Sequence, residues 1–136
     1  FSFTFLAQSY PTARIALPNE VADKNFDPQN YDIIMLTPQQ TSHIKNQSVD
    51  LTVNVHSMQE MNNEAIYSYF DLVDRISKPG GIFFCANRME KIMDGKPIRF
   101  LDYPWRSNTR TIIFEPDPLI RLVKLSPSYI RVEQYT

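Results

Sequence analysis

The sequence predicts a three-layer α/β fold, with a mainly parallel sheet, helices against its faces and an antiparallel pair of strands at the C-terminal end. Residues 31–38 and 81–88 are dense apolar runs of strand length, the type that is buried on both faces of a parallel sheet. A helical pattern links a strand at 49–56 to the one at 81–88, and such a crossover is typical of parallel neighbours. Residues 109–116 and 129–135 alternate polar and apolar side chains, which indicates the antiparallel pair.

The first part of the chain carries weaker signals. Residues 1–10 are rich in apolar side chains and end at Pro11, which predicts the tail of a helix. Residues 13–18 form a short strand candidate that a proline stops, and Asp27-Pro28 is a turn signal before the apolar run at 31–38. The chain opens without an initiator methionine or a signal-peptide layout. We therefore expect residues 1–136 to be the C-terminal portion of one longer domain.

The central segment has the clearest pattern. Alternating apolar and polar residues predict a strand over 49–56. Residues 61–78 follow with helical spacing, an asparagine cap at 62–63 and a Pro-Gly-Gly stop at 79–81. We expect the strands before and after this helix to be parallel neighbours, because the helix has the usual crossover length. Residues 89–105 are predicted as a short helical or loop region.

Composition restricts the class of protein. The chain has 136 residues, enough for one domain, and a mean hydropathy of -0.33 that fits a soluble globular protein. Its 14 Lys and Arg against 15 Asp and Glu give a net charge of -1, which argues against nucleic-acid binding. The apolar runs are too short to insert into a membrane. The single cysteine, Cys85, lies in an apolar run and is expected to be a buried hydrophobe in a reducing, cytoplasmic setting.

Polar side chains follow two of the predicted strands at the points where they end. His56 to Glu60 come after one strand, and Asn87 and Arg88 come after the next strand. Ligands of open α/β sheets bind off the carboxyl ends of the strands. The sequence therefore predicts that these two groups line one crevice.

These segments resemble a known family. The stretches SVDLTVNVHSMQEM and KPGGIFFCANR resemble the second half of a class I, Rossmann-like methyltransferase that depends on S-adenosylmethionine (SAM). The pattern N-x-H-S-M-Q-E-M, the following N-R and a later Y-P-W are similar to the family of sugar O-methyltransferases found near bacterial surface-polysaccharide genes. The family's glycine-rich loop and ribose-binding acidic residue have no counterpart in the chain, and we expect both to lie upstream.

The resemblance implies a function and a cofactor. It implies methyl transfer from SAM to a hydroxyl of a sugar or sugar conjugate in polysaccharide biosynthesis, with Thr37, Gln39, Asn54 and Val55 near the cofactor. The alternative is a non-catalytic module, derived from a methyltransferase, that binds sugars or completes a partner's sheet. A nucleotide-dependent oxidoreductase is less favoured because no dinucleotide motif is present. An unpaired sheet edge would also favour self-association.

Two residues are candidates for the catalytic base. His56 would lie at the carboxyl end of its strand, and a neutral imidazole is suited to removing a proton from a hydroxyl. The plainer interpretation is that His56 caps the strand end through a backbone carbonyl. Glu60 is the base itself, a residue that orients His56, or an acid that favours the dipole of the next helix.

The predicted substrate contacts each have a structural alternative. Hydroxyl and amide groups can bind a sugar or satisfy backbone groups at the turn, and Arg88 can bind a ligand or form a surface ion pair. Two aromatic residues can stack on a sugar face or pack against the domain. His43 is expected in solvent, and we expect no metal site, because two ligands four residues apart are too few. The predicted substrate contacts are Ser57, Gln59, Asn87, Arg88, Tyr103 and Trp105.

Overall fold

The computed structural model describes residues 2–118, 120 and 127–136. The chain divides into two compact units, residues 1–43 and 44–136, and each is described by itself. Together they contain helices, parallel strands and antiparallel strands, so the fold belongs to the mixed α/β class.

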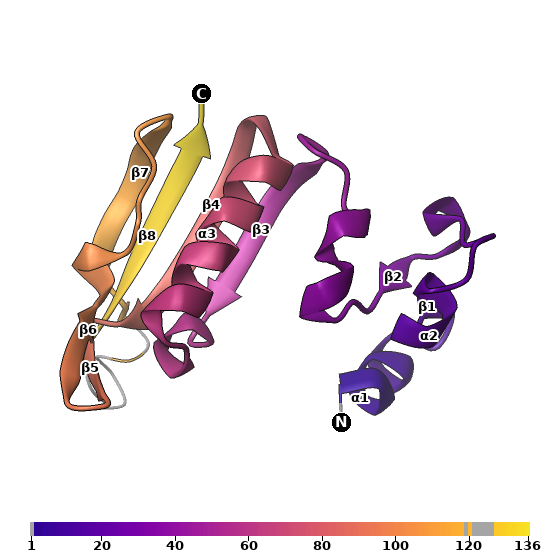
Figure 1. Cartoon of the computed structure of the whole chain (residues 1–136), viewed down its shortest axis with the longest axis horizontal. Coiled ribbons are helices and arrows are strands. Elements are labelled where there is room, and N and C mark those ends of the chain that lie inside the picture. The colour runs from indigo at the N-terminus through magenta and orange to yellow at the C-terminus, as the bar shows by residue number, and fades with distance from the viewer. Residues whose placement is uncertain (1, 119, 121–126) are drawn as a thin grey trace. The chain divides into compact units, whose positions relative to one another are not determined.

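The first unit is small and contains short helices and two short strands (Figure 1). A helix covers the predicted N-terminal helical segment, and two short strands pair in parallel through Ile15 with Ile33 and Ala16 with Ile34. The predicted strand over 31–38 is therefore mostly wrong, because only two of its residues join a sheet and both are half-buried. The elements are α1 (Ser2–Ser9), β1 (Ile15–Ala16), α2 (Pro18–Val21), η1 (Pro28–Asn30), β2 (Ile33–Ile34) and η2 (Pro38–His43).

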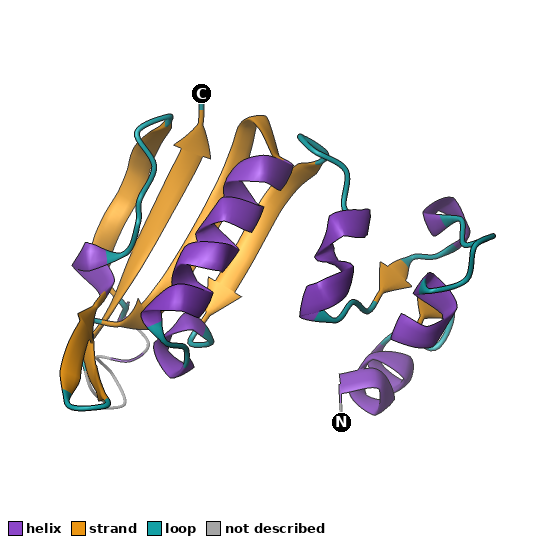
Figure 2. Ribbon diagram, viewed as in Figure 1, coloured by secondary structure: helices purple, strands orange, loops and turns teal. Residues whose placement is uncertain are grey.

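The second unit contains a four-stranded sheet in the order β3-β4-β8-β7 (Figure 2). β3 and β4 are parallel, which confirms the predicted parallel neighbours, and β7 and β8 are antiparallel, which confirms the predicted C-terminal pair. β8 also runs antiparallel to β4. β7 therefore runs in the same direction as β3 and β4, and the carboxyl ends of all three strands lie at the same end of the sheet. The strands are β3 (Val49–Val55), β4 (Ser77–Arg88), β7 (Thr109–Pro116) and β8 (Ser128–Tyr135).

Helix α3 (Asn63–Ile76) crosses between β3 and β4 and packs on one face of the sheet (Figure 1). The Asn62 side chain accepts a hydrogen bond from the Ala65 N–H at 2.9 Å, as predicted for the cap. The buried stripe of α3 contains Phe70, whose ring contacts Phe83 of β4 edge-on at 5.5 Å. These contacts form the centre of the core, whose buried members are Met58, Ile66, Phe70, Val73, Phe83, Cys85, Ile98, Phe100, Tyr103 and Tyr135.

The junction between α3 and β4 differs from the prediction. The helix ends at Ile76 and the strand begins at Ser77, so the Pro-Gly-Gly segment at 79–81 lies inside the strand range. The β3–β4 register shifts there. A Cβ atom on Gly81 would lie 2.8 Å from the Lys78 carbonyl oxygen, so only glycine fits at this close approach. The Pro-Gly-Gly segment thus forms an irregularity in the strand rather than the end of the helix.

Residues 89–105 contain a hairpin that the sequence analysis missed. β5 (Glu90–Met93) and β6 (Lys96–Arg99) are antiparallel, and η4 (Phe100–Asp102) follows. The turn residues Asp94 and Gly95 both have positive φ, 51° and 72°, as in the tight turns that favour Asp-Gly.

The alternation of β3 places its polar residues, and not its apolar ones, on the face of the sheet that α3 covers. Thr52 and Asn54 point to the face that α3 covers, because they pair with Phe83 and Cys85 of the core. The residues that alternate with them are apolar, point to the other face and are more than half exposed. They are Leu51, Val53 and Val55. Within the part of the chain that the structure describes, no helix is long and apolar enough to cross a membrane.

Candidate functional site

His56 lies immediately after β3 and leaves the strand conformation, with a left-handed φ of 57°. Residues other than glycine rarely adopt this backbone conformation. Such backbone strain is concentrated at functional sites. The His56 N–H donates to the Ala86 carbonyl at 2.8 Å, so a backbone bond fixes the turned residue against β4. Its side chain remains about one-third exposed, which leaves the ring accessible.

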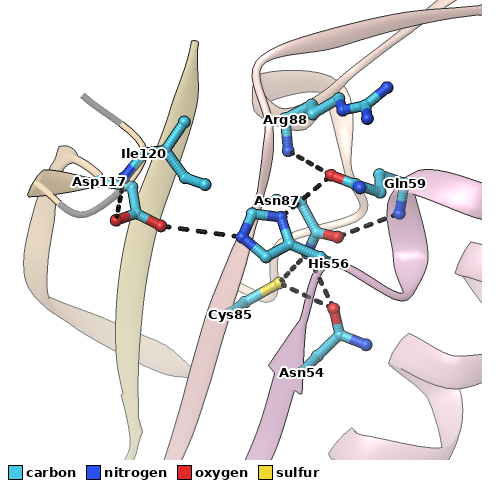
Figure 3. Close-up of polar contacts among 8 residues, drawn as sticks. All are labelled: Asn54, His56, Gln59, Cys85, Asn87, Arg88, Asp117 and Ile120. Carbon is cyan, nitrogen blue, oxygen red and sulfur yellow. Dashed lines mark hydrogen bonds and ion pairs between the residues drawn. The ribbon is translucent and has the colours of Figure 1, made fainter. Parts of the chain in front are cut away.

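The imidazole is held between two polar side chains (Figure 3). Nδ1 lies 3.1 Å from Gln59 Oε1, and Nε2 lies 3.9 Å from a carboxylate oxygen of Asp117. Gln59 Oε1 also accepts from the Arg88 N–H, and Gln59 Nε2 donates to Glu60, which fixes the orientation of the amide. Because Gln59 presents an acceptor, Nδ1 carries the hydrogen. The neutral ring therefore keeps its lone pair on Nε2, toward Asp117.

Nε2 lies close to the Asp117 carboxylate without a direct hydrogen bond to it. A separation of 3.9 Å is too long for a direct hydrogen bond. A hydroxyl that approaches the exposed ring can donate to Nε2, and the carboxylate lies close enough to stabilise the imidazolium that forms when the proton moves.

Asn87 connects the strand end to this arrangement. It is fully buried, and its Oδ1 accepts from the Gln59 N–H at 3.0 Å. Its Nδ2 donates to Asn54 Oδ1 at 2.8 Å and to Cys85 Sγ at 3.2 Å. Asn54 in turn donates to the Ser57 hydroxyl. The structure thus brings the polar residues after β3 and the last two residues of β4 into one network, at the strand ends where the sequence predicted a shared crevice.

Asp117 was missed by the sequence analysis. It follows β7, its N–H donates to the Ser128 carbonyl at 2.9 Å, and its Oδ1 accepts from the Ile120 N–H at 3.3 Å. Its side chain is 9% exposed. Asp117 could have been a candidate, because it is a polar residue directly after the predicted strand 109–116. Polar residues that follow two strands share a site only when the strands run in the same direction, and the sequence did not show that β7 runs in the same direction as β3.

The other polar candidates lie at the rim of the network. Ser57 and Glu60 are exposed, and Glu60 Oε1 accepts from Gln59 Nε2 at 3.2 Å. Gln59, not Glu60, is therefore the residue that contacts His56. Arg88 joins the network through its backbone N–H, and its side chain is exposed.

Tyr103 is buried in the hydrophobic core, and Trp105 is half-buried and packs against it. Both rings contact Phe70, at 6.0 Å and 5.0 Å, and Trp105 Nε1 donates to the Phe100 carbonyl at 3.1 Å. The Arg131 guanidinium lies 4.2 Å from the centre of the Trp105 ring, a cation–π contact. Burial raises the pKa of the Tyr103 hydroxyl. Tyr103 is only 7% exposed, so its packing corrects the prediction that this ring stacks on a sugar.

The four residues expected near SAM are divided between the units. Thr37 and Gln39 belong to the first unit, where the Thr37 N–H and hydroxyl both donate to Gln40 Oε1. Asn54 and Val55 belong to β3, and the Asn54 amide is engaged on both its oxygen and its nitrogen. Within the described residues, no group of three or more histidine, cysteine or acidic side chains is arranged to hold a metal ion.

Cys85 is buried beneath the network, and burial raises the pKa of its thiol to about 12. The folded chain is therefore expected to leave Cys85 unmodified by a thiol reagent such as Ellman's reagent at pH 8, because little thiolate forms and the sulfur is covered. Denaturant should release one reactive thiol per chain. Rapid labelling without denaturant would show that the strand end opens readily.

Comparisons with known proteins identify the fold. No family model matches the chain, and no curated protein matches it. Among solved structures, the PH0226 protein from Pyrococcus horikoshii OT3 aligns with a TM-score of 0.53 and 12% identity over 98% of this chain and 76% of its own. A SAM-dependent methyltransferase from Archaeoglobus fulgidus aligns with a TM-score of 0.51 and 13% identity over 97% of this chain and 80% of its own. The chain therefore has a methyltransferase-like α/β fold.

Proposed function

We propose that this chain is the acceptor-activating part of a SAM-dependent O-methyltransferase that acts on a hydroxyl of a sugar or sugar conjugate. The observation that carries the proposal is the placement of His56 at the carboxyl end of β3, with Nδ1 on Gln59 and Nε2 toward Asp117. The fold likeness supports the methyltransferase class. The resemblance of NVHSMQEM, PGG and NR to sugar O-methyltransferases supports the acceptor and a role in surface-polysaccharide synthesis in the cytoplasm.

Residues of this site take up the proton that the acceptor hydroxyl loses. The acceptor hydroxyl donates to His56 Nε2, and the imidazole takes the proton as the oxygen becomes a nucleophile. Gln59 holds Nδ1–H throughout, so the ring keeps its orientation. The nearby Asp117 carboxylate stabilises the positive charge that develops on the ring. The proton then leaves to solvent from the exposed part of the imidazole.

Several rim groups are suited to a polyhydroxylated acceptor. Ser57 and Glu60 after β3 and Arg88 at the end of β4 have exposed side chains that offer a hydroxyl, a carboxylate and a guanidinium. A sugar presents several hydroxyl groups that donate and accept hydrogen bonds at once. We therefore assign the acceptor contacts to these three residues and remove Tyr103 and Trp105 from the site.

The side chains of Thr37 and Asn54, two of the residues expected to bind SAM, do not fit that cofactor in this structure. When bound, SAM supplies a methyl group on a positively charged sulfur. Its ribose and amino acid parts need free polar partners, but Gln40 satisfies Thr37, and Asn87 and Ser57 engage Asn54. Val55 offers only an exposed alkyl group. The polar contacts to SAM must therefore come from residues other than Thr37 and Asn54.

This chain alone is expected to bind SAM more weakly than about 1 mM, because the side chains of Thr37 and Asn54 are already used within the chain. Isothermal titration calorimetry on residues 1–136 measures this directly. A dissociation constant in the micromolar range would contradict the prediction and would return Thr37 and Asn54 to the cofactor site.

The function is tested on the intact protein that carries this chain. Methyl-labelled SAM is incubated with the protein and a panel of glycosides, and label transferred to the sugar is measured. We expect transfer to a hydroxyl oxygen, which mass spectrometry of the product would locate. Sugar binding without transfer would instead favour the non-catalytic module, and transfer to nitrogen or carbon would exclude an O-methyltransferase.

A further inference from the structure

Strand β7 contains one residue more than the part of β8 with which it pairs. Thr111 lies opposite Glu133 of β8. Two residues further along β7, Ile113 lies opposite Val132, which is only one residue away from Glu133. Ile112 is therefore an extra residue, and the register shift that it causes is a β-bulge. A bulge changes which side chains later in the strand reach a given place, and bulges are common next to functional sites.

The bulge determines which residue meets Ser128 at the end of β7. This residue is Asp117, whose N–H donates to the Ser128 carbonyl and whose carboxylate lies 3.9 Å from His56 Nε2 (Figure 3). Without the extra residue, the register that holds before the bulge would place Pro116 opposite Ser128. Proline has no N–H to donate, and Asp117 would lie one residue, about 3.3 Å, further along the strand direction. The carboxylate would then no longer face the imidazole.

A buried cluster fixes β7 immediately before the bulge. The Glu133 side chain is 2% exposed, and its Oε1 accepts from the Thr111 hydroxyl at 2.6 Å. The Arg131 guanidinium donates to the same Glu133 oxygen and to the Thr111 hydroxyl, and it lies over the Trp105 ring. Breaking these bonds would leave a buried carboxylate without its partners, which is costly. A change in the number of residues in β7 is therefore expected to shift the strand after the bulge and not the strand before it.

We propose that the extra residue Ile112, next to the strand position that Glu133 holds, sets the register that places Asp117 beside His56. Ile112 acts through its backbone and Glu133 acts through Thr111, so both are positioning residues and not catalytic ones. The inference rests on the proposed function, in which Asp117 stabilises the charged imidazole. It also gives a role to Glu133, a buried carboxylate that the proton transfer does not use.

Disulfide trapping measures the register at the end of β7 without any assay of activity. Glu115 lies directly opposite Ile130, and opposite residues of an antiparallel pair have Cα atoms within the range that a disulfide spans. Glu115→Cys with Ile130→Cys should therefore cross-link on oxidation. Phe114→Cys with Ile130→Cys should not, because neighbouring residues of a strand point to opposite faces. Deleting Ile112 should reverse this pattern, and Ellman's reagent in denaturant counts the thiols that remain, including the buried native Cys85.

Moving the aspartate along the chain of the intact protein tests the link to the site. The double variant Pro116→Asp with Asp117→Asn carries its carboxylate one residue too early, so its turnover should be about tenfold below wild type. Deleting Ile112 from this double variant should restore turnover to within about threefold of wild type, because residue 116 then meets Ser128. Damage to the fold cannot explain a deletion that raises activity.

The control Ile112→Ala keeps the extra backbone residue and should show the cross-linking pattern of the unaltered chain. A cross-link between Phe114→Cys and Ile130→Cys in the chain that retains Ile112 would overturn the proposal, and this result decides it if the deletion variants fail to fold by circular dichroism. A folded deletion variant with an unchanged pattern, or without restored turnover, would overturn the proposal alone. Absence of turnover in the wild-type protein would overturn the proposed function as well.

Discussion

Replacing His56 with alanine is expected to lower the turnover of the intact protein about a hundredfold, the usual scale for loss of a general base. The variant loses the Nε2 lone pair that faces Asp117, while backbone contacts of the strand end remain. The affinity for SAM should stay nearly unchanged, because His56 acts on the acceptor. Steady-state kinetics with the natural acceptor and a separate SAM titration measure the two effects.

The pH dependence of turnover provides a second readout. A protonated imidazole cannot accept a proton, so wild-type activity should fall toward acid pH. That acidic limb should disappear in His56→Ala. Asp117→Asn should keep the limb but lower turnover roughly tenfold, because the carboxylate no longer stabilises the charged ring. A purely structural His56 would leave the shape of the pH profile unchanged.

Two other variants separate the alternatives. His43→Ala removes the chain's other histidine, which is exposed and lies in the first unit, and should leave turnover unchanged. Glu60→Gln should have a smaller effect than His56→Ala, because Glu60 reaches the ring only through Gln59. Near-normal turnover of His56→Ala would show that the residue caps the strand. A large loss in Glu60→Gln would then make Glu60 the base.

Much of the second unit could be predicted because its signals are local and consistent. The cap at Asn62, the helical spacing after it and the alternation in β7 and β8 each depend on neighbouring residues. The β5–β6 hairpin was missed although Asp94-Gly95 is a local turn signal, because Pro97 within a short strand argues against strand. The predicted strand over 31–38 is longer than the observed β2, because an apolar run of strand length does not reveal how many of its residues pair with another strand.

The sequence predicted only those site residues that lie at the ends of strands whose relative direction it also predicted. His56 and Asn87 could be placed together because a crossover helix makes β3 and β4 parallel. Asp117 depends on the direction of β7, which is set by its pairing with β8 and not by its own residues. The packing of Tyr103 and Trp105 depends on the distant Phe70 of α3, so the sequence left sugar stacking and core packing equally open.

Replacing Asn87 with alanine is expected to destabilise the second unit by about 3 kcal/mol, because it removes three hydrogen bonds from a fully buried side chain. The Gln59 N–H and Asn54 Oδ1 would each lose a partner. Urea unfolding followed by the fluorescence of Trp105, the single tryptophan, reports on this core. Asn63→Ala, an exposed position at the start of α3, should change stability by less than about 0.5 kcal/mol.

Asn87→Asp separates the hydrogen bond that the Asn87 side chain accepts from those that it donates. The aspartate keeps an acceptor for the Gln59 N–H but, when ionised, cannot donate to Asn54. It should therefore lose stability at neutral pH, while Gln59 remains placed to hold His56 Nδ1. We expect turnover per folded molecule to fall about tenfold in Asn87→Ala and by less in Asn87→Asp. Equal turnover losses in both variants would show that Asn87 does not act on His56 through Gln59, and a stability loss below about 1 kcal/mol in Asn87→Ala would show that the buried network contributes little to folding.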